Sequence, residues 1–197
     1  TEPIAIAYAC AKARQILGQM PERLELWCSG NIIKNVKGVV VPNSGGLHGI
    51  EVAGILGIVG GNPDKELEVL ESVTAEDIEK TKILLKQDFC TCHLIENVDN
   101  LFIAAKVFAG TENAEVEIAN RHTNITRLVK NGQELDVGAL VEYAEHQGTK
   151  LDKSLLNVKD ILEFADCVAI EDVKDVLDNQ IQMNTAISQK KLKNSYG

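Results

Sequence analysis

The chain has 197 residues, of which 45% are hydrophobic and 25% charged, which is ordinary for a globular protein with a hydrophobic core. Its net charge of −9 argues against nucleic acid or an anionic membrane as a partner, because both would repel it. The longest apolar run, Ile50–Val59, is too short to span a bilayer, and the first residues lack the basic region of a signal peptide, so we expect a cytoplasmic protein.

The first predicted element is a buried helix. Thr1 and Glu2 suit the cap positions, Pro3 suits the first turn, and Gly18 with Pro21 ends the helix. The segment 4–11 is apolar on nearly every side, which indicates a helix buried all round. Because a capping residue stands at position 1 and no methionine precedes it, we expect the natural chain to continue upstream.

A glycine-rich stretch, residues 30–63, follows a strand predicted over 23–33. Within it Gly54, Gly57 and Gly60 recur every third residue and would form one smooth ridge on a helix. Each glycine costs roughly 1 kcal/mol against alanine in a helix interior, so the backbone there has to approach something closely. Two interpretations stay open: the ridge is the floor of a ligand site, or it only allows close helix packing.

The remaining elements alternate between helix and strand. Thr74 and Asp77 have the spacing of a capping box, which predicts a helix to about Lys86. Polar breaks then separate short apolar segments, a pattern typical of an antiparallel meander, and the pattern becomes helical again from Asp136. The predicted strands are 89–96, 101–109, 114–119 and 125–129, and the later helices are 137–146, 158–168 and 173–193.

These elements predict an α+β fold with an antiparallel sheet of about four to five strands flanked by two helical regions. We expect residues 1–197 to form one unit, helical and glycine-rich over 1–88, strand-rich over 89–135, and helical over 136–197. Motifs for a phosphate-binding loop, a dinucleotide-binding turn and a nucleophile elbow are absent from the sequence.

The five cysteines do not predict a disulfide framework, because their number is odd. Cys90 and Cys92 would lie on one face of a strand and His93 on the other, so the three cannot close on one metal ion. Buried free thiols are the favoured interpretation.

Two sets of polar residues remain as candidates for a site. The loop 121–124 can point several donors one way, although a lone histidine such as His122 is often a structural residue. In the last helix Asn184 lies on the same face as Val173, Leu177 and Ile181, and an asparagine on a buried stripe needs internal or ligand partners.

Several of these segments together resemble one enzyme family, the L-cysteine desulfidases, which are related to the alpha chain of iron–sulfur L-serine dehydratases. The resemblance runs from the first residue to the last. It rests on the motifs Thr1-Glu2-Pro3-Ile4-Ala5, Ser29-Gly30-Asn31-Ile32-Ile33-Lys34-Asn35, Gly60-Gly61-Asn62-Pro63, His122-Thr123-Asn124, Met183-Asn184 with Ala186-Ile187, and Asn194-Ser195-Tyr196-Gly197.

The resemblance implies a pyridoxal-independent lyase that converts L-cysteine or L-serine to pyruvate, ammonia and sulfide or water, with a 4Fe-4S cluster in the full-length enzyme. A small zwitterionic amino acid needs donors for its carboxylate, and backbone N–H groups at the two loop glycines can approach the same anion. The candidate substrate-binding residues are Thr1, Glu2, Asn31, Lys34, Asn35, Gly45, Gly46, His122, Thr123, Asn124 and Asn184.

The chain departs from the family pattern at both ends. The signature cysteine would immediately precede Thr1, and the cluster-binding cysteines would follow Gly197, so we expect neither a catalytic residue nor a metal ligand in this chain. It should be the N-terminal portion of the enzyme and inactive alone.

Two alternatives are a non-catalytic amino-acid-binding module and a structural half whose glycines let a helix dock against the missing portion. In the second case the apolar face of residues 50–59 would be exposed. The sequence leaves a homodimer open.

Overall fold

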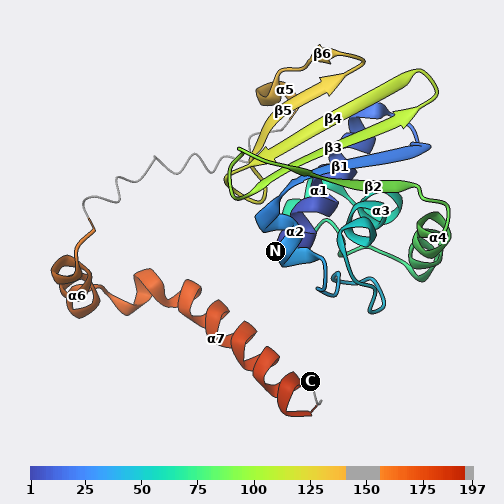
Figure 1. Ribbon diagram of the computed structural model, residues 1–197. Coiled ribbons are helices and arrows are strands. Elements are labelled where there is room, and N and C mark those ends of the chain that lie inside the picture. The colour runs from blue at the N-terminus through green and yellow to red at the C-terminus, as the bar shows by residue number, and fades with distance from the viewer. Residues whose placement is uncertain (141–155, 194–197) are drawn as a thin grey trace. The chain divides into compact units, whose positions relative to one another are not determined.

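The computed structural model describes residues 1–140 and 156–193 (Figure 1). The chain divides into two compact units, Thr1–Tyr143 and Ala144–Gly197, and each is described by itself. Most of the helix predicted over 137–146 and the whole motif 194–197 lie outside the described residues.

The first unit has the predicted α+β class, but the prediction of an antiparallel sheet with four to five strands is wrong. The sheet is mixed and six-stranded, in the order β2-β1-β3-β4-β5-β6. β1 pairs in parallel with β2 on one side and antiparallel with β3 on the other, whereas β3 to β6 form the expected meander. The strands are β1 Arg23–Ser29, β2 Cys90–Ile95, β3 Phe102–Ala109, β4 Glu112–Ala119, β5 Ile125–Lys130 and β6 Gln133–Glu134.

Helices α1 to α4 gather on one face of the sheet, and the short α5 lies beside β5 (Figure 1). The helices of this unit are α1 Glu2–Leu17, α2 Gly30–Val36, α3 Ile50–Gly60, the 3-10 helix η1 Pro63–Glu68, α4 Ala75–Leu85 and the short α5 Val137–Leu140. α1 is buried on nearly all sides as predicted, because it lies against both α3 and the strands β3 and β4. The capping box of Thr74 and Asp77 is present at the start of α4.

The predicted strand 23–33 is too long, because Ser29 ends it. The Ser29 hydroxyl accepts a hydrogen bond from the Ile32 backbone N–H and donates one to the Asn100 carbonyl oxygen at 2.6 Å. Such a cap satisfies a backbone N–H group that the first turn of a helix leaves without a partner. Residues 30–36 therefore form α2 instead of continuing β1.

The two faces of the sheet differ in chemistry, as period-two alternation requires. The face toward α1 carries buried apolar side chains, including Leu26, Ala105 and Val116. The opposite face carries a charged network in which the Arg127 guanidinium contacts Glu115 at 3.2 Å and Glu117 at 3.0 Å. The core of the first unit therefore lies between the sheet and its helices.

The three ridge glycines of α3 approach different elements closely: Gly57 approaches α1, Gly54 approaches β1 and Gly60 approaches α4. A Cβ atom added to Gly57 would come within 2.3 Å of the Ala7 carbonyl oxygen, and one added to Gly54 within 3.0 Å of the Leu24 and Leu26 side chains. Apart from Glu51, residues 50–58 are buried, so the exposed apolar face that the structural-half alternative required on α3 is not present. Of the two interpretations of this ridge, close helix packing is the one that the contacts explain.

The second unit consists of two described helices, α6 Val158–Cys167 and α7 Ile170–Lys193. Asn157 caps α6 by accepting a hydrogen bond from the Asp160 backbone N–H at 3.0 Å. In the described parts of both units, no helix combines the length and the apolar character needed to cross a membrane.

We predict that Gly57→Ala destabilises the protein by about 1–3 kcal/mol, because the added methyl group forces the α1 and α3 backbones apart. The intrinsic preference of helices for alanine, about 1 kcal/mol, works in the opposite direction and is too small to compensate. Urea unfolding monitored by circular dichroism measures the change. Gly38→Ala is the matched control, since the space around Gly38 is open and its stability should stay within about 0.5 kcal/mol. Equal unfolding midpoints for the two variants would contradict this account of the packing.

Candidate functional site

Three of the predicted site residues meet at the N-terminal end of α1. The Asn35 amide Nδ2 donates a hydrogen bond to Glu2 Oε1 at 3.5 Å, which joins α2 to α1. The Thr1 backbone nitrogen lies 3.3 Å from Glu2 Oε2. The pKa of the Glu2 carboxyl is lowered, chiefly by a hydrogen bond from the Glu2 backbone N–H.

His122 is the fourth member of this group and comes from the loop between β4 and β5. It lies near enough for its charge to contribute to the lowered pKa of Glu2. The His122 side chain is half-buried, and its Nε2 atom is buried without a hydrogen-bond partner in the described part of the chain. A buried polar atom without a partner is costly in a folded protein, so this nitrogen marks a place where a ligand can bind.

Asn124 holds the loop that presents His122. Its side-chain Nδ2 donates to the Ala119 carbonyl oxygen at 2.9 Å, and its backbone N–H donates to the Arg121 carbonyl oxygen at 3.1 Å. The neighbouring Thr123 carbonyl oxygen accepts from the Ile125 N–H at 3.1 Å, where β5 begins. Within the predicted triplet, Thr123 and Asn124 therefore shape the turn, and His122 is the member whose charge acts on Glu2.

The resulting set of groups suits a zwitterion. The Glu2 carboxylate can accept hydrogen bonds from an ammonium group, while the Asn35 amide and the His122 ring can donate to a carboxylate. The lowered pKa keeps Glu2 ionised to a lower pH than an ordinary glutamate.

The structure does not bring the other predicted residues into this group. Asn31 lines a separate surface depression of about 370 Å³, bounded by Ser29, Gly30 and the segment 94–100, and Lys34 is exposed. Gly45 and Gly46 lie in the loop before α3, where a Cβ on Gly45 would meet the Ile78 side chain of α4.

Asn184 lies in the second unit, and the expectation that it belongs to a buried stripe is wrong. The Asn184 side chain is exposed, and its Nδ2 donates to the Gln180 carbonyl oxygen one turn earlier at 2.8 Å. None of the residues of α7 is buried.

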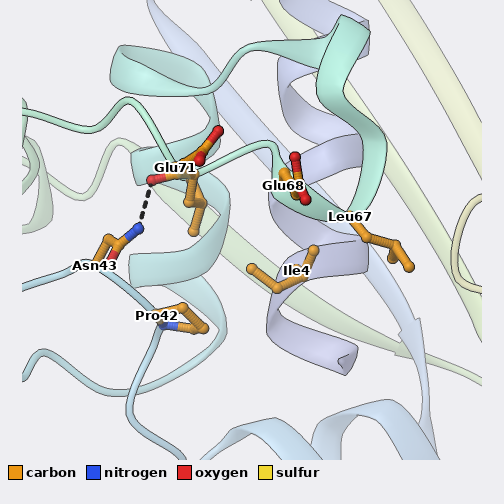
Figure 2. Close-up of a pocket in the computed structure, with 7 residues that line it drawn as sticks. Ile4, Pro42, Asn43, Leu67, Glu68 and Glu71 are labelled. Carbon is orange, nitrogen blue, oxygen red and sulfur yellow. Dashed lines mark hydrogen bonds between the residues drawn. The ribbon is translucent and has the colours of Figure 1, made fainter. Parts of the chain in front are cut away.

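A second depression, of about 220 Å³, lies beside the start of α1 (Figure 2). It is lined by Ile4 of α1, by Pro42 and Asn43, and by Leu67, Glu68, Leu70 and Glu71 at and after the end of η1. The Asn43 side-chain amide donates to the Leu70 carbonyl oxygen at 2.9 Å and joins the two walls. Glu68 and Glu71 line the opening, and Glu71 forms an ion pair with Lys65 at 2.5 Å. The lining of this depression is apolar with carboxylates at its rim, and it offers no group of hydrogen-bond donors for a carboxylate ligand. We therefore place the candidate site at Glu2, Asn35 and His122.

The thiols of Cys10, Cys28, Cys90 and Cys92 lie near one another beside β1 and β2. In the parallel register Leu26 pairs with Cys92 and Cys28 pairs with Leu94, so Cys28 and Cys92 are diagonal neighbours on one face. A hydrogen bond from Cys28 lowers the pKa of Cys92, and the same bond, together with burial, raises the pKa of Cys28. Burial also raises the pKa of Cys10 and of Cys90.

All five cysteines are free as predicted, but only Cys10 and Cys28 are fully buried, whereas Cys90 and Cys92 are half-buried and Cys167 is exposed. The hydrogen bond between Cys28 and Cys92 was not predicted from the sequence. Cys28 and Cys92 are far apart in the chain, and only the adjacency of β1 and β2 brings them together. The same adjacency stacks the rings of Trp27 and His93 on the opposite face, with centroids 4.5 Å apart.

The described residues do not fit a metal centre. Across 1–140 and 156–193, no three side chains of His, Cys, Asp or Glu are arranged to hold a metal ion. The described part of the chain therefore offers no set of ligands for an iron–sulfur cluster.

Comparison with known proteins gives relatives of greater length. The chain is 45% identical to a UPF0597 protein of Lachnoclostridium phytofermentans, 43% to one of Finegoldia magna and 39% to one of Treponema denticola. Each alignment covers 100% of this chain but only 46–47% of the relative, so the chain spans about half the length of the relatives it matches. No family model and no solved structure matches the chain.

The lowered pKa of Cys92 predicts that this thiol reacts faster with alkylating reagents than Cys90 does. At neutral pH, iodoacetamide should modify Cys92 faster than Cys90, since thiolate is the reactive form and only Cys92 has a lowered pKa. Cys10 and Cys28 should stay protected, because both are buried. Mass spectrometry of peptides after timed labelling measures the rates.

Cys28→Ala supplies the decisive comparison, because it removes the hydrogen bond to Cys92. In Cys28→Ala, the pH at which Cys92 is labelled at half its maximal rate should rise. In Cys10→Ala, this midpoint pH should not change. A midpoint unchanged in Cys28→Ala would show that the hydrogen bond does not control this thiol.

Proposed function

We propose that this chain forms the amino-acid-binding portion of a pyridoxal-independent, iron–sulfur-dependent lyase that eliminates the β-substituent of L-cysteine or L-serine. The observation that carries the proposal is the buried, unpartnered Nε2 of His122 beside the Glu2–Asn35 pair. The motif resemblance supports the reaction class, and the relatives, more than twice as long, leave room for the reactive cysteine and cluster ligands elsewhere.

In this proposal the chain orients the substrate. The ammonium group of the amino acid pairs with the Glu2 carboxylate, and its carboxylate takes hydrogen bonds from Asn35 and His122. Two contacts at opposite ends of a small zwitterion fix the direction of the α-hydrogen, and correct orientation alone accounts for a large part of many enzymatic accelerations. The Fe–S cluster would supply Lewis acidity toward the leaving group in the complete enzyme. A cytoplasmic location belongs to the same proposal.

Calorimetric titration with L-cysteine and L-serine under anaerobic conditions tests the binding step. We expect saturable heat with the unmodified chain and an affinity lower by about tenfold or more in Glu2→Gln, which removes the charge that pairs with the ammonium group, and in His122→Ala, which removes a donor to the carboxylate. His48→Ala is the matched control, since His48 is exposed in the loop before α3 and this variant should bind as the unmodified chain does. Absence of heat, or equal affinity in all four proteins, would refute the proposed site.

The pH dependence follows from the lowered pKa of Glu2. Binding should be constant around neutral pH and weaken only as the pH falls through that lowered pKa, because protonation removes the charge that holds the ammonium group. In Glu2→Gln this acidic loss should disappear. A loss that persists unchanged in Glu2→Gln would assign the titration to another group.

The chain alone should bind without turnover. Release of pyruvate, ammonia and sulfide, assayed anaerobically after iron–sulfur reconstitution, should stay at background. Turnover by this chain would show that its own residues suffice for the elimination.

A further inference from the structure

Taken by itself, the second unit has an apolar face on α7 that none of its own described residues covers. Along α7 the side chains of Ile170, Leu177 and Ile181 are 46–70% exposed, and Ile187, which is 67% exposed, lies about 120° around the helix from Ile181 at the edge of the same apolar face. At 3.6 residues per turn these positions form one stripe along a helix about 36 Å long. A helix of this composition gains most of its stability from packing, so the stripe needs a partner.

The charges on α7 identify the partner. Its first nine residues carry four carboxylates, Glu171, Asp172, Asp175 and Asp178, and one lysine, Lys174. From residue 179 to the end it carries no carboxylate and three lysines, Lys190, Lys191 and Lys193. The helix is therefore acidic at one end and basic at the other, and an antiparallel copy of itself matches both ends at once.

We propose that α7 pairs with α7 of a second copy of this chain in an antiparallel arrangement around a two-fold axis. The arrangement puts the acidic end of each helix beside the basic end of the other and also opposes the two helix dipoles favourably. A parallel pair would place like charges side by side. Asn184 lies within the stripe, and its side-chain Nδ2 already has a partner in the Gln180 carbonyl, which lowers the cost of burying it.

Charge reversal tests the pairing in solution. Sedimentation equilibrium of the chain should show a dimer that weakens with added salt. The variants Glu171→Lys/Asp172→Lys/Asp175→Lys and Lys190→Glu/Lys191→Glu/Lys193→Glu should each dimerise at least tenfold more weakly, and an equimolar mixture of the two should recover the association. Lys80→Glu/Lys82→Glu/Lys86→Glu, which changes the same charge around α4, is the control and should dimerise normally. A monomeric chain, or variants that associate as before, would overturn the proposal.

Because reversed charges oppose the helix dipole, orientation is also tested without them. Cys167 ends α6, three residues before α7 begins, and is exposed. In an antiparallel pair the two Cys167 thiols lie near opposite ends of the helices, so mild oxidation of the unmodified chain should give little covalent dimer. In the Cys167→Ser background, Val173→Cys/Lys191→Cys should give a disulfide between the two copies, whereas Val173→Cys alone and Lys191→Cys alone should not. Efficient Cys167–Cys167 linkage in the unmodified chain would indicate a parallel pair and refute the arrangement.

Discussion

The first unit depends on how closely α3 approaches α1. Gly57 lies against the backbone of Ala7, at a distance where no side chain of any size fits. The Arg14 guanidinium then closes the contact from α1, by donating to the Ile58 carbonyl and, at 2.8 Å, to the Gly61 carbonyl. These carbonyls stand at the C-terminal end of α3, where helix geometry leaves oxygen atoms without partners. One arginine thus satisfies the end of α3 and fixes its position along α1.

That contact determines where the N-terminal end of α1 lies. α1 rests on β3 and β4, so its first turn comes near the loop that leaves β4, and this loop carries His122. α2 follows β1 directly because Ser29 ends the strand, and its Asn35 reaches Glu2 from the other side. Three segments that are far apart in the sequence therefore place one polar group each at the same point. The helix packing and the candidate site are consequences of one arrangement.

Local signals in the sequence predicted local structure well. The capping box at Thr74, the αL glycine at Gly18 and the all-round burial of α1 follow from neighbouring residues alone. The parallel pairing of β1 with β2 did not follow, because strands separated by 60 residues carry no mark of their adjacency, and Cys28–Cys92 was missed for the same reason. The sequence predicted Glu2, Asn35 and His122 as site residues. It could not distinguish them from a polar residue with a structural role such as Asn124, whose side-chain amide stabilises a turn.

Asn184 is a candidate residue in both proposals, and the two roles exclude each other. The motif resemblance makes it a candidate ligand of the amino acid, whereas the charge pattern of α7 places it inside a helix pair. Its Nδ2 donates to the Gln180 carbonyl, and the groups left over are one N–H and the Oδ1 acceptor. Buried between two helices, those groups face the second copy and not the ligand. If the antiparallel pair forms, substrate recognition in this chain therefore rests on the first unit alone, with Glu2, Asn35 and His122 as its polar contacts.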